Sequence, residues 1–132
     1  MIVRTLADIG NDPLRDVAGE GWRSRRLLLA GDKMGFSLHD TLIPAGTALS
    51  LWYRNHLEAV YCIAGKGSVT AEADGVPHAI EPGTLYALDQ NDKHVLQAEE
   101  ELRLVCVFNP PCVGREAHDE TGAYPLPAAD ET

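Results

Sequence analysis

The strongest constraint on the fold is a series of short apolar or alternating segments separated by turns rich in Gly and Pro. No segment shows a sustained helical period, and only residues 6–9 are a helix candidate. Many short strands at this spacing are typical of a β-sandwich or barrel. The sequence therefore predicts an all-β domain with strands at residues 26–29, 36–43, 47–53, 59–63, 68–73, 85–88, 94–98 and 102–108.

The length and the charge limit what such a barrel can do. The chain has 132 residues, 45% of them hydrophobic, which suits one domain with one core. Its formal net charge is −9, so binding to a nucleic-acid backbone is disfavoured. The apolar runs are too short to span a membrane. The N-terminal residues 1–4 lack the apolar region of a secretion signal, so we expect a cytoplasmic protein.

Three cysteines, Cys62, Cys106 and Cys112, are present, without a CxxC motif. An odd number of cysteines in a chain without a secretion signal favours reduced thiols over disulfides. Cys62 and Cys106 lie in apolar segments, where a thiol usually serves as a small hydrophobic side chain. We therefore expect structural rather than catalytic cysteines.

A spaced set of residues follows Gly46. Trp52, Arg54, Glu58 and Gly65 occur at the intervals of the first cupin motif, which places two histidines, a glutamate and a glycine after its first glycine. Both histidine positions are occupied by other residues, whereas the glutamate and the glycines are present. The spacing thus resembles that of a cupin barrel, in which neighbouring strands direct ligands to one point inside the bore.

The second cupin motif can be placed on Gly75 in the same way. Its proline position falls on Glu81, directly before Pro82-Gly83, its histidine position on Tyr86, and its asparagine position on Gln90. The chain therefore resembles a cupin double-stranded β-helix, or jelly-roll barrel, with a changed set of metal ligands.

A third ligand is expected from His94, which lies eight residues after Tyr86 and beyond a polar turn. Glu58, Tyr86 and His94 would provide two oxygens and one nitrogen. Such a mixed set with open positions suits Fe(II), Mn(II) or Zn(II). Each of these residues alone is more often structural; the hypothesis depends on all three falling on positions that the barrel framework defines.

Longer stretches of the chain, from residue 1 to about residue 126, resemble the ectoine synthase family. Runs of this length are more specific than a short motif. They are Ser24-Arg25-Arg26-Leu27-Leu28-Leu29, Trp52-Tyr53-Arg54-Asn55-His56-Leu57-Glu58-Ala59-Val60-Tyr61-Cys62-Ile63, Pro82-Gly83-Thr84-Leu85-Tyr86-Ala87-Leu88-Asp89, Asp92-Lys93-His94, Val105-Cys106-Val107-Phe108-Asn109-Pro110-Pro111, and the late Glu116, His118-Asp119-Glu120, Gly122 and Tyr124-Pro125-Leu126.

The resemblance implies a cytoplasmic homodimer that acts on a small molecule and makes a compatible solute for protection against osmotic stress. The reaction would be the metal-assisted, intramolecular, cyclising dehydration of 4-N-acetyl-L-2,4-diaminobutyrate to ectoine and water. The metal would be a divalent ion, with Fe(II) preferred, held by Glu58, Tyr86 and His94. The resemblance also implies a substrate pocket lined by Trp22, Arg26, Thr41, Tyr53, His56, Phe108, Glu116 and His118.

Acid–base chemistry is expected from Tyr53, Glu116 and His118, because the attacking amine must lose protons and the departing oxygen must gain them. Arg26 could bind the substrate carboxylate as a bidentate pair. Trp22 and Phe108 could provide apolar or cation–π walls. The resemblance assigns no role to His39 and Asp40.

The expected domain covers residues 1–126, with the barrel at 22–109, a mostly irregular C-terminal lid at 110–126, and a disordered tail at 127–132. Closing the lid over the barrel mouth would exclude water from the reaction. Two other readings compete: another cupin enzyme, such as an isomerase or dioxygenase, and a cupin that binds a ligand without turnover. Fold alone does not separate them, because one barrel hosts many functions.

Overall fold

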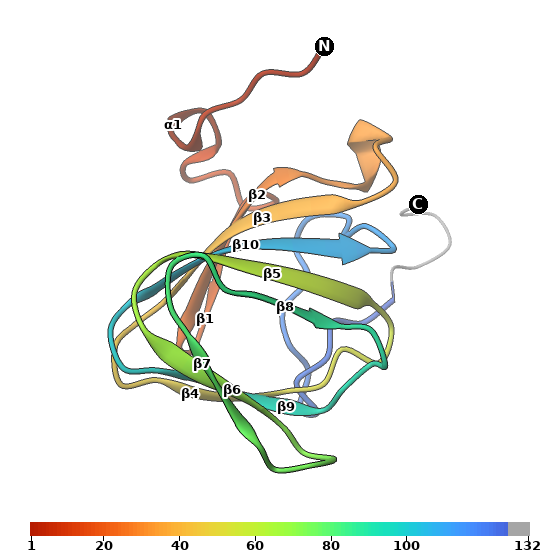
Figure 1. The fold of residues 1–132 in the computed structure, drawn as a ribbon. Helices are drawn as coiled ribbons and strands as arrows, with labels where there is room; N and C mark the ends of the chain where they lie inside the picture. The colour runs from red at the N-terminus through yellow and green to blue at the C-terminus, as the bar shows by residue number, and fades with distance from the viewer. Residues whose placement is uncertain (127–132) are drawn as a thin grey trace.

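The computed structural model describes residues 1–126, and the expected disordered tail at 127–132 lies outside the described residues. The strands form two antiparallel sheets that face each other around the core (Figure 1). They are β1 (Asp16–Gly19), β2 (Trp22–Leu28), β3 (Ser37–Ile43), β4 (Ala48–Leu51), β5 (Leu57–Ala64), β6 (Gly67–Ala71), β7 (Pro77–Ile80), β8 (Leu85–Leu88), β9 (His94–Ala98) and β10 (Leu102–Asn109). A short helix α1 (Leu6–Ile9) and a 3-10 helix (Ala30–Asp32) complete the elements.

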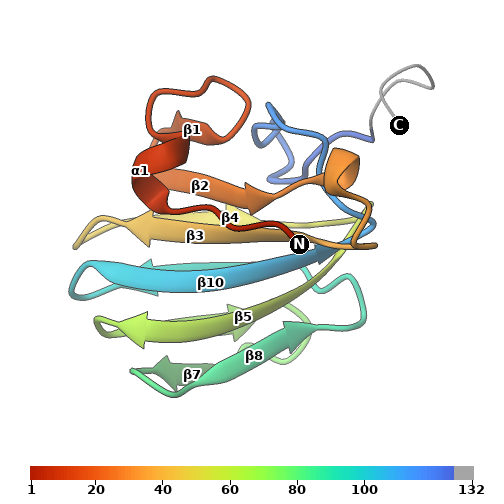
Figure 2. The ribbon, with the colours of Figure 1, turned by 90° about the horizontal axis from the view of Figure 1, so that it is seen from above.

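The six-stranded sheet has the order β1-β2-β3-β10-β5-β8, and the four-stranded sheet has the order β4-β9-β6-β7. Figure 2 shows the larger sheet from its outer side, with β10 between β3 and β5. Strands that are distant in sequence are therefore neighbours, as in a jelly roll. The predicted all-β, cupin-type fold is confirmed, and so is the helix at residues 6–9.

Two strands were missed in the sequence. β1 pairs with β2, so the larger sheet begins at Asp16 rather than at Trp22. β7 is an edge strand that starts with Pro77, and only Ile80 of its residues is buried. Edge strands tolerate Pro and need little apolar alternation, which explains the weak signal. The strand expected at 47–53 ends at Leu51, so Trp52 and Tyr53 lie in the following turn.

Alternation along the central strands separates the two faces of the larger sheet. In β10, Leu102, Leu104, Cys106 and Phe108 are buried, and the intervening residues are partly exposed. β5 follows the same rule, with Glu58 on the inward set. Because successive side chains of a strand point to opposite faces, this register places Glu58 inside the barrel.

Residues 110–126, the lid, contain no helix or strand. The lid nevertheless connects the two sheets: the backbone N–H of Trp52 donates to the Gly122 carbonyl at 2.9 Å, and Tyr124 belongs to the core. Gly122 has φ +80°, and a Cβ there would lie 2.4 Å from the Ser50 carbonyl oxygen. Only glycine permits this close approach of the lid to β4.

Candidate functional site

A cavity lies between the two sheets and beneath the lid. The space it encloses, including the part open to solvent, is about 390 Å³. Several residues expected from the sequence line it, namely Trp22, Thr41, Tyr53, Glu58, Tyr86, Phe108 and His118. These seven residues thus converge on one cavity, although they come from five strands, the turn after β4 and the lid.

Glu58 and Tyr86 face this cavity from neighbouring strands, since Val60 of β5 pairs with Tyr86 of β8. Burial raises the pKa of the Glu58 carboxyl to about 8, against a smaller opposing effect of a hydrogen bond with Cys106. Burial, together with the nearby Glu58 charge, raises the pKa of the Tyr86 phenol well above its usual range. A bound cation would favour the ionised form of both groups.

His94 opens β9 and is buried. Its Nδ1 lies 2.9 Å from the Asp92 carbonyl oxygen, and its Nε2 has no hydrogen-bond partner among the described residues. A backbone contact at one ring nitrogen that leaves the other nitrogen open is the usual arrangement of a metal-binding histidine. Burial lowers the pKa of His94, which favours the neutral form that a metal requires.

His94 lines a second cavity rather than the first, and Tyr86 lines both. Tyr86 is thus the proposed metal donor that the two cavities share. Within residues 1–126, no group of three His, Cys, Asp or Glu side chains is arranged to hold a metal, so a site here needs the Tyr86 phenol as a donor. The unpartnered imidazole nitrogen, the buried carboxyl and the phenol fit a divalent cation in chemical type.

Tyr53 and His118 form the closest polar pair in the first cavity. The Tyr53 hydroxyl lies 2.7 Å from His118 Nε2. Burial raises the pKa of Tyr53 well above its usual value, so its hydroxyl keeps its proton and donates to the imidazole. Burial, and then the nearby Arg26 charge, lowers the pKa of His118 to about 4. At neutral pH, His118 is therefore an uncharged imidazole that can accept a proton.

Aromatic rings fix the orientation of His118. Its ring stacks on Tyr124 with centroids 4.5 Å apart and an interplanar angle of 6°. Trp22 meets it edge-on with centroids 5.0 Å apart. The imidazole is thus held by ring contacts in addition to its hydrogen bond with Tyr53.

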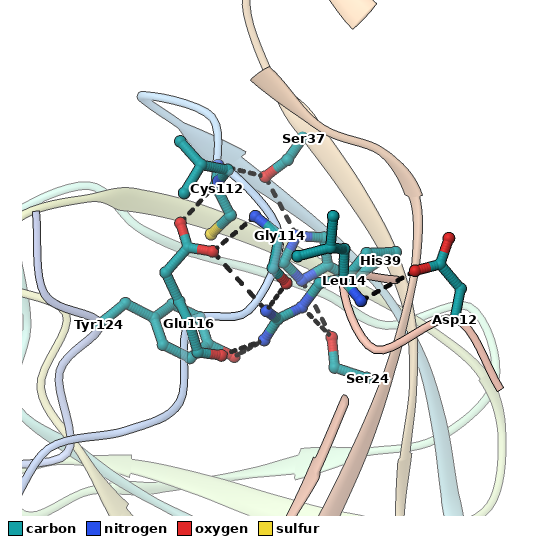
Figure 3. Close-up of polar contacts among 11 residues, drawn as sticks. Asp12, Leu14, Ser24, Ser37, His39, Cys112, Gly114, Glu116 and Tyr124 are labelled. Carbon is teal, nitrogen blue, oxygen red and sulfur yellow. Dashed lines mark hydrogen bonds and ion pairs between the residues drawn. The ribbon is translucent and has the colours of Figure 1, made fainter. Parts of the chain in front are cut away.

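Arg26 and Glu116 do not line the cavity; they hold the lid. The Arg26 side chain is fully buried and donates to the carbonyl oxygens of Gly114 and Glu116, at 2.5 Å and 2.6 Å. The Glu116 carboxylate accepts the backbone N–H groups of Val113 and Gly114 (Figure 3). Substrate binding by Arg26 and acid–base catalysis by Glu116 stay predictions, because these groups are engaged within the protein.

His56 is buried outside the cavity lining. Neither ring nitrogen has a hydrogen-bond partner among the described residues. The ring meets Phe108 and Tyr124 edge-on, with centroids 5.8 Å and 6.1 Å away. Substrate binding by His56 also stays a prediction. Asp40 points away from the cavity and forms ion pairs with Arg25 and Arg103.

Besides five aliphatic side chains, two cavity residues with a thiol or hydroxyl group were missed in the sequence. They are Cys106 and Tyr124. The alternation of β10 could have located Cys106, because it lies two residues before the inward-facing Phe108. No periodic signal exists in the irregular lid, so only contacts in the folded chain identify Tyr124.

The lowered pKa of His118 predicts how stability depends on pH. In an unfolded chain this imidazole titrates near 6.5, roughly. As pH falls from there to about 4, the unfolded state binds the proton before the folded state does, so the free energy of unfolding decreases. We expect His118→Leu to show a shallower loss of stability across this window in chemical denaturation. Replacement of the exposed His78 is the control, and an equal slope in wild type and His118→Leu would contradict the expectation.

Within residues 1–126 no helix is long and apolar enough to cross a membrane. Comparisons with known proteins then identify the family. The ectoine synthase family model matches residues 1–128. The L-ectoine synthase of Desulfatibacillum aliphaticivorans is 63% identical over 129 residues, which cover 96% of this chain and 98% of the relative.

Another relative, the L-ectoine synthase of Alkalilimnicola ehrlichii, is 56% identical over 98% of both chains. Among solved structures, the ectoine synthase of P. lautus is 50% identical, with a TM-score of 0.85 over 100% of this chain and 96% of that one. The match extends over the barrel, the lid and every residue of the candidate site. The chain belongs to the ectoine synthase family.

Proposed function

We propose that this protein is a hydro-lyase that converts 4-N-acetyl-L-2,4-diaminobutyrate into ectoine and water. The observation that carries the proposal is the Tyr53–His118 pair, which lies in one cavity with Glu58 and Tyr86 in a chain of this family. An intramolecular condensation needs proton transfer and a shape that folds a flexible substrate, and this cavity offers both.

The α-amino nitrogen forms a bond with the carbonyl carbon of the acetamide, and the C–O bond of that carbon breaks. Two protons leave the attacking nitrogen, both end on the departing oxygen, and water is released. The product is a cyclic amidine that keeps the positive charge of the substrate ammonium. No oxidant, reductant or co-substrate is consumed.

His118 is the proposed proton relay in this scheme. Its uncharged imidazole offers a lone pair to a proton of the ammonium, and because a pKa of about 4 disfavours the imidazolium, it passes the proton on to Tyr53 rather than keeping it. Tyr53 donates its proton to the oxygen that develops negative charge, and recovers one from His118 across the 2.7 Å contact. The pair therefore returns to its starting state after each of the two transfers.

The walls of the cavity supply orientation. Trp22 and Phe108 present apolar ring surfaces, and Trp22 can place its face against the substrate ammonium. Holding both reacting groups of one molecule in contact can contribute roughly 7–11 kcal/mol to catalysis. Thr41 also lines the cavity. Arg26, His56 and Glu116 remain in the proposed binding set on the family resemblance alone.

Glu58, Tyr86 and His94 would hold a divalent metal, with Fe(II) proposed first and Zn(II) or Mn(II) as alternatives. When bound, such an ion polarises a carbonyl oxygen as a Lewis acid. Support comes from the buried carboxyl of Glu58 and the unpartnered Nε2 of His94.

Turnover separates this proposal from a cupin that only binds its ligand. The purified protein is mixed with an excess of 4-N-acetyl-L-2,4-diaminobutyrate, and the ring signals of ectoine are followed by NMR. The proposal predicts many equivalents of ectoine per protein chain. If the protein binds the substrate or ectoine but forms no ectoine with Fe(II), with Zn(II) and with Mn(II), the result would support the binding module and refute the enzyme.

A homodimer is proposed from the outer face of the larger sheet. Leu57, Tyr61 and Ile63 of β5 and Leu85 of β8 are exposed there, and Tyr61 pairs with Leu85 in register. Large exposed apolar patches usually mark an interface. We expect a solution mass of twice 14.3 kDa by light scattering, and a monomer for Tyr61→Glu with Ile63→Glu. A monomeric wild type would refute the dimer.

We also propose that the protein is cytoplasmic.

A further inference from the structure

Three buried side chains form a polar chain between β2, β3 and the lid. His39 is fully buried, with its Nδ1 3.1 Å from Ser24 Oγ and its Nε2 3.1 Å from Ser37 Oγ. Ser24 and Ser37 are buried as well. Figure 3 shows this group beside the lid residues Cys112 and Gly114.

A neutral His39 donates at one ring nitrogen and accepts at the other, and both serines can match it. Ser24 Oγ accepts the Nε–H of Arg26 at 3.1 Å, and its own hydrogen can go to His39 Nδ1. In that tautomer His39 is protonated at Nε2 and donates to Ser37 Oγ, which also accepts the backbone N–H of Cys112 at 3.0 Å. In the other tautomer both His39 hydrogen bonds reverse, with the same partners. Burial, and then the Arg26 charge, lowers the pKa of His39 well below its usual value, which keeps the ring neutral.

Both ends of the chain attach to the lid. One end orients Arg26, whose guanidinium binds the carbonyl oxygens of Gly114 and Glu116. The other end binds Cys112, near the point where the lid leaves β10. A long guanidinium loses side-chain entropy when it is fixed, and a neighbour that holds its Nε–H keeps the fork aimed at its acceptors.

The position of the lid decides where His118 lies. Glu116 precedes His118 by two residues, and the Arg26 guanidinium lies 5.3 Å from the centre of the Tyr124 ring on which His118 stacks. Displacement of Gly114 and Glu116 would therefore carry His118 away from the Tyr53 hydroxyl. A misplacement of roughly 1 Å can cost about 100-fold in rate.

We propose that His39 is a positioning residue, which with Ser24 and Ser37 orients Arg26 and anchors the lid so that His118 meets Tyr53. Its consequence for catalysis rests on the proposed function, whereas its consequence for the lid does not. The competing explanation is that His39 is a polar core residue that contributes only to the stability of the barrel.

Three variants test the proposal. His39→Leu removes both hydrogen bonds at similar volume. His39→Gln keeps an acceptor and a donor for the two serines, so it should retain part of the anchoring of the lid. Ser37→Ala removes the hydroxyl that contacts His39 and the backbone N–H of Cys112. It serves as a milder variant in case His39→Leu does not fold.

Two readouts follow the lid without any assay of activity. Arg115 is exposed in the lid, so trypsin cuts after it whenever the lid opens locally. We expect this cut, identified by mass spectrometry, to be about tenfold faster or more in His39→Leu than in the wild type. The increase should be smaller in Ser37→Ala, and His39→Gln should lie between the wild type and His39→Leu. We also expect the pKa of His118, followed by NMR of its ring nitrogens, to move from about 4 toward its usual value in His39→Leu.

Activity is the third readout. We expect kcat of His39→Leu to fall about 100-fold, while its far-ultraviolet circular dichroism spectrum stays that of the folded barrel. Unchanged cleavage after Arg115 and an unchanged His118 titration in folded His39→Leu, or in Ser37→Ala, would overturn the proposal. Absence of ectoine formation in the wild type would refute the proposed function instead, and the lid readouts would still decide the role of His39.

Discussion

His118→Ala lowers kcat by about 10²–10⁴, with a small change in KM, if His118 moves protons during the reaction. The imidazole lies 2.7 Å from the Tyr53 hydroxyl, and its pKa of about 4 keeps it uncharged at neutral pH. An effect confined to kcat is the signature of an interaction made in the transition state rather than in substrate binding. Steady-state kinetics on the two proteins measure the effect.

Tyr53→Phe is the matched variant, because it removes only the hydroxyl and keeps the ring that packs on Phe108 and Tyr124. If the two residues act as one relay, the double variant loses little more than either single one. A rise in KM with kcat unchanged would show that His118 only binds substrate, and would move the search for the base to other residues of the cavity.

Removal of a proposed metal donor has the second large effect. We expect Glu58→Ala, Tyr86→Phe and His94→Ala each to lose bound metal, and with it activity by at least about 10²–10³. Among the described residues, the buried Nε2 of His94 has no hydrogen-bond partner, and the buried carboxyl of Glu58 is held by a hydrogen bond with Cys106. Metal content by mass spectrometry and ectoine formation are measured on the same samples.

Glu99→Gln, in the exposed turn before β10, is the control for these variants, since it removes a carboxylate far from the cavity. It should keep metal and activity. A folded donor variant that lacks metal but remains fully active would contradict the proposed role of this site.

The fold was predictable where glycine is required by the backbone. Gly65 has φ +93°, and a Cβ there would lie 2.0 Å from the Glu101 carbonyl oxygen. Such a residue marks a turn in the sequence because no other side chain fits. The cupin spacing on Gly46 and Gly65 therefore gave the correct framework, and the alternation of β5 gave the inward position of Glu58.

The replaced histidines of the first cupin motif have a structural explanation. Trp52 and Arg54 occupy those positions, and both lie outside the cavity with the Arg54 guanidinium 5.0 Å from the centre of the Trp52 ring. The loop after β4 thus turns these two side chains away from the bore. Tyr53, between them, provides the inward side chain instead.

The contacts of Arg26 could not be predicted from sequence patterns. Its acceptors in the lid lie 88 and 90 residues away, and a long side chain in a strand reaches partners that no periodicity encodes. The bidentate chemistry of arginine suggested that Arg26 binds the substrate carboxylate, whereas its contacts show a guanidinium engaged with the lid. His39 is a similar case, because only the folded chain brings it between Ser24 and Ser37.

The most direct test of metal-assisted cyclisation follows ectoine by NMR with one protein sample in three states: chelator-treated, reloaded with Fe(II), and reloaded with Zn(II) or Mn(II). The account predicts that ectoine forms rapidly after reloading and at most at a trace rate after chelation. Equal rates in the chelated and reloaded samples would contradict the metal role of Glu58, Tyr86 and His94, and would leave catalysis to Tyr53 and His118.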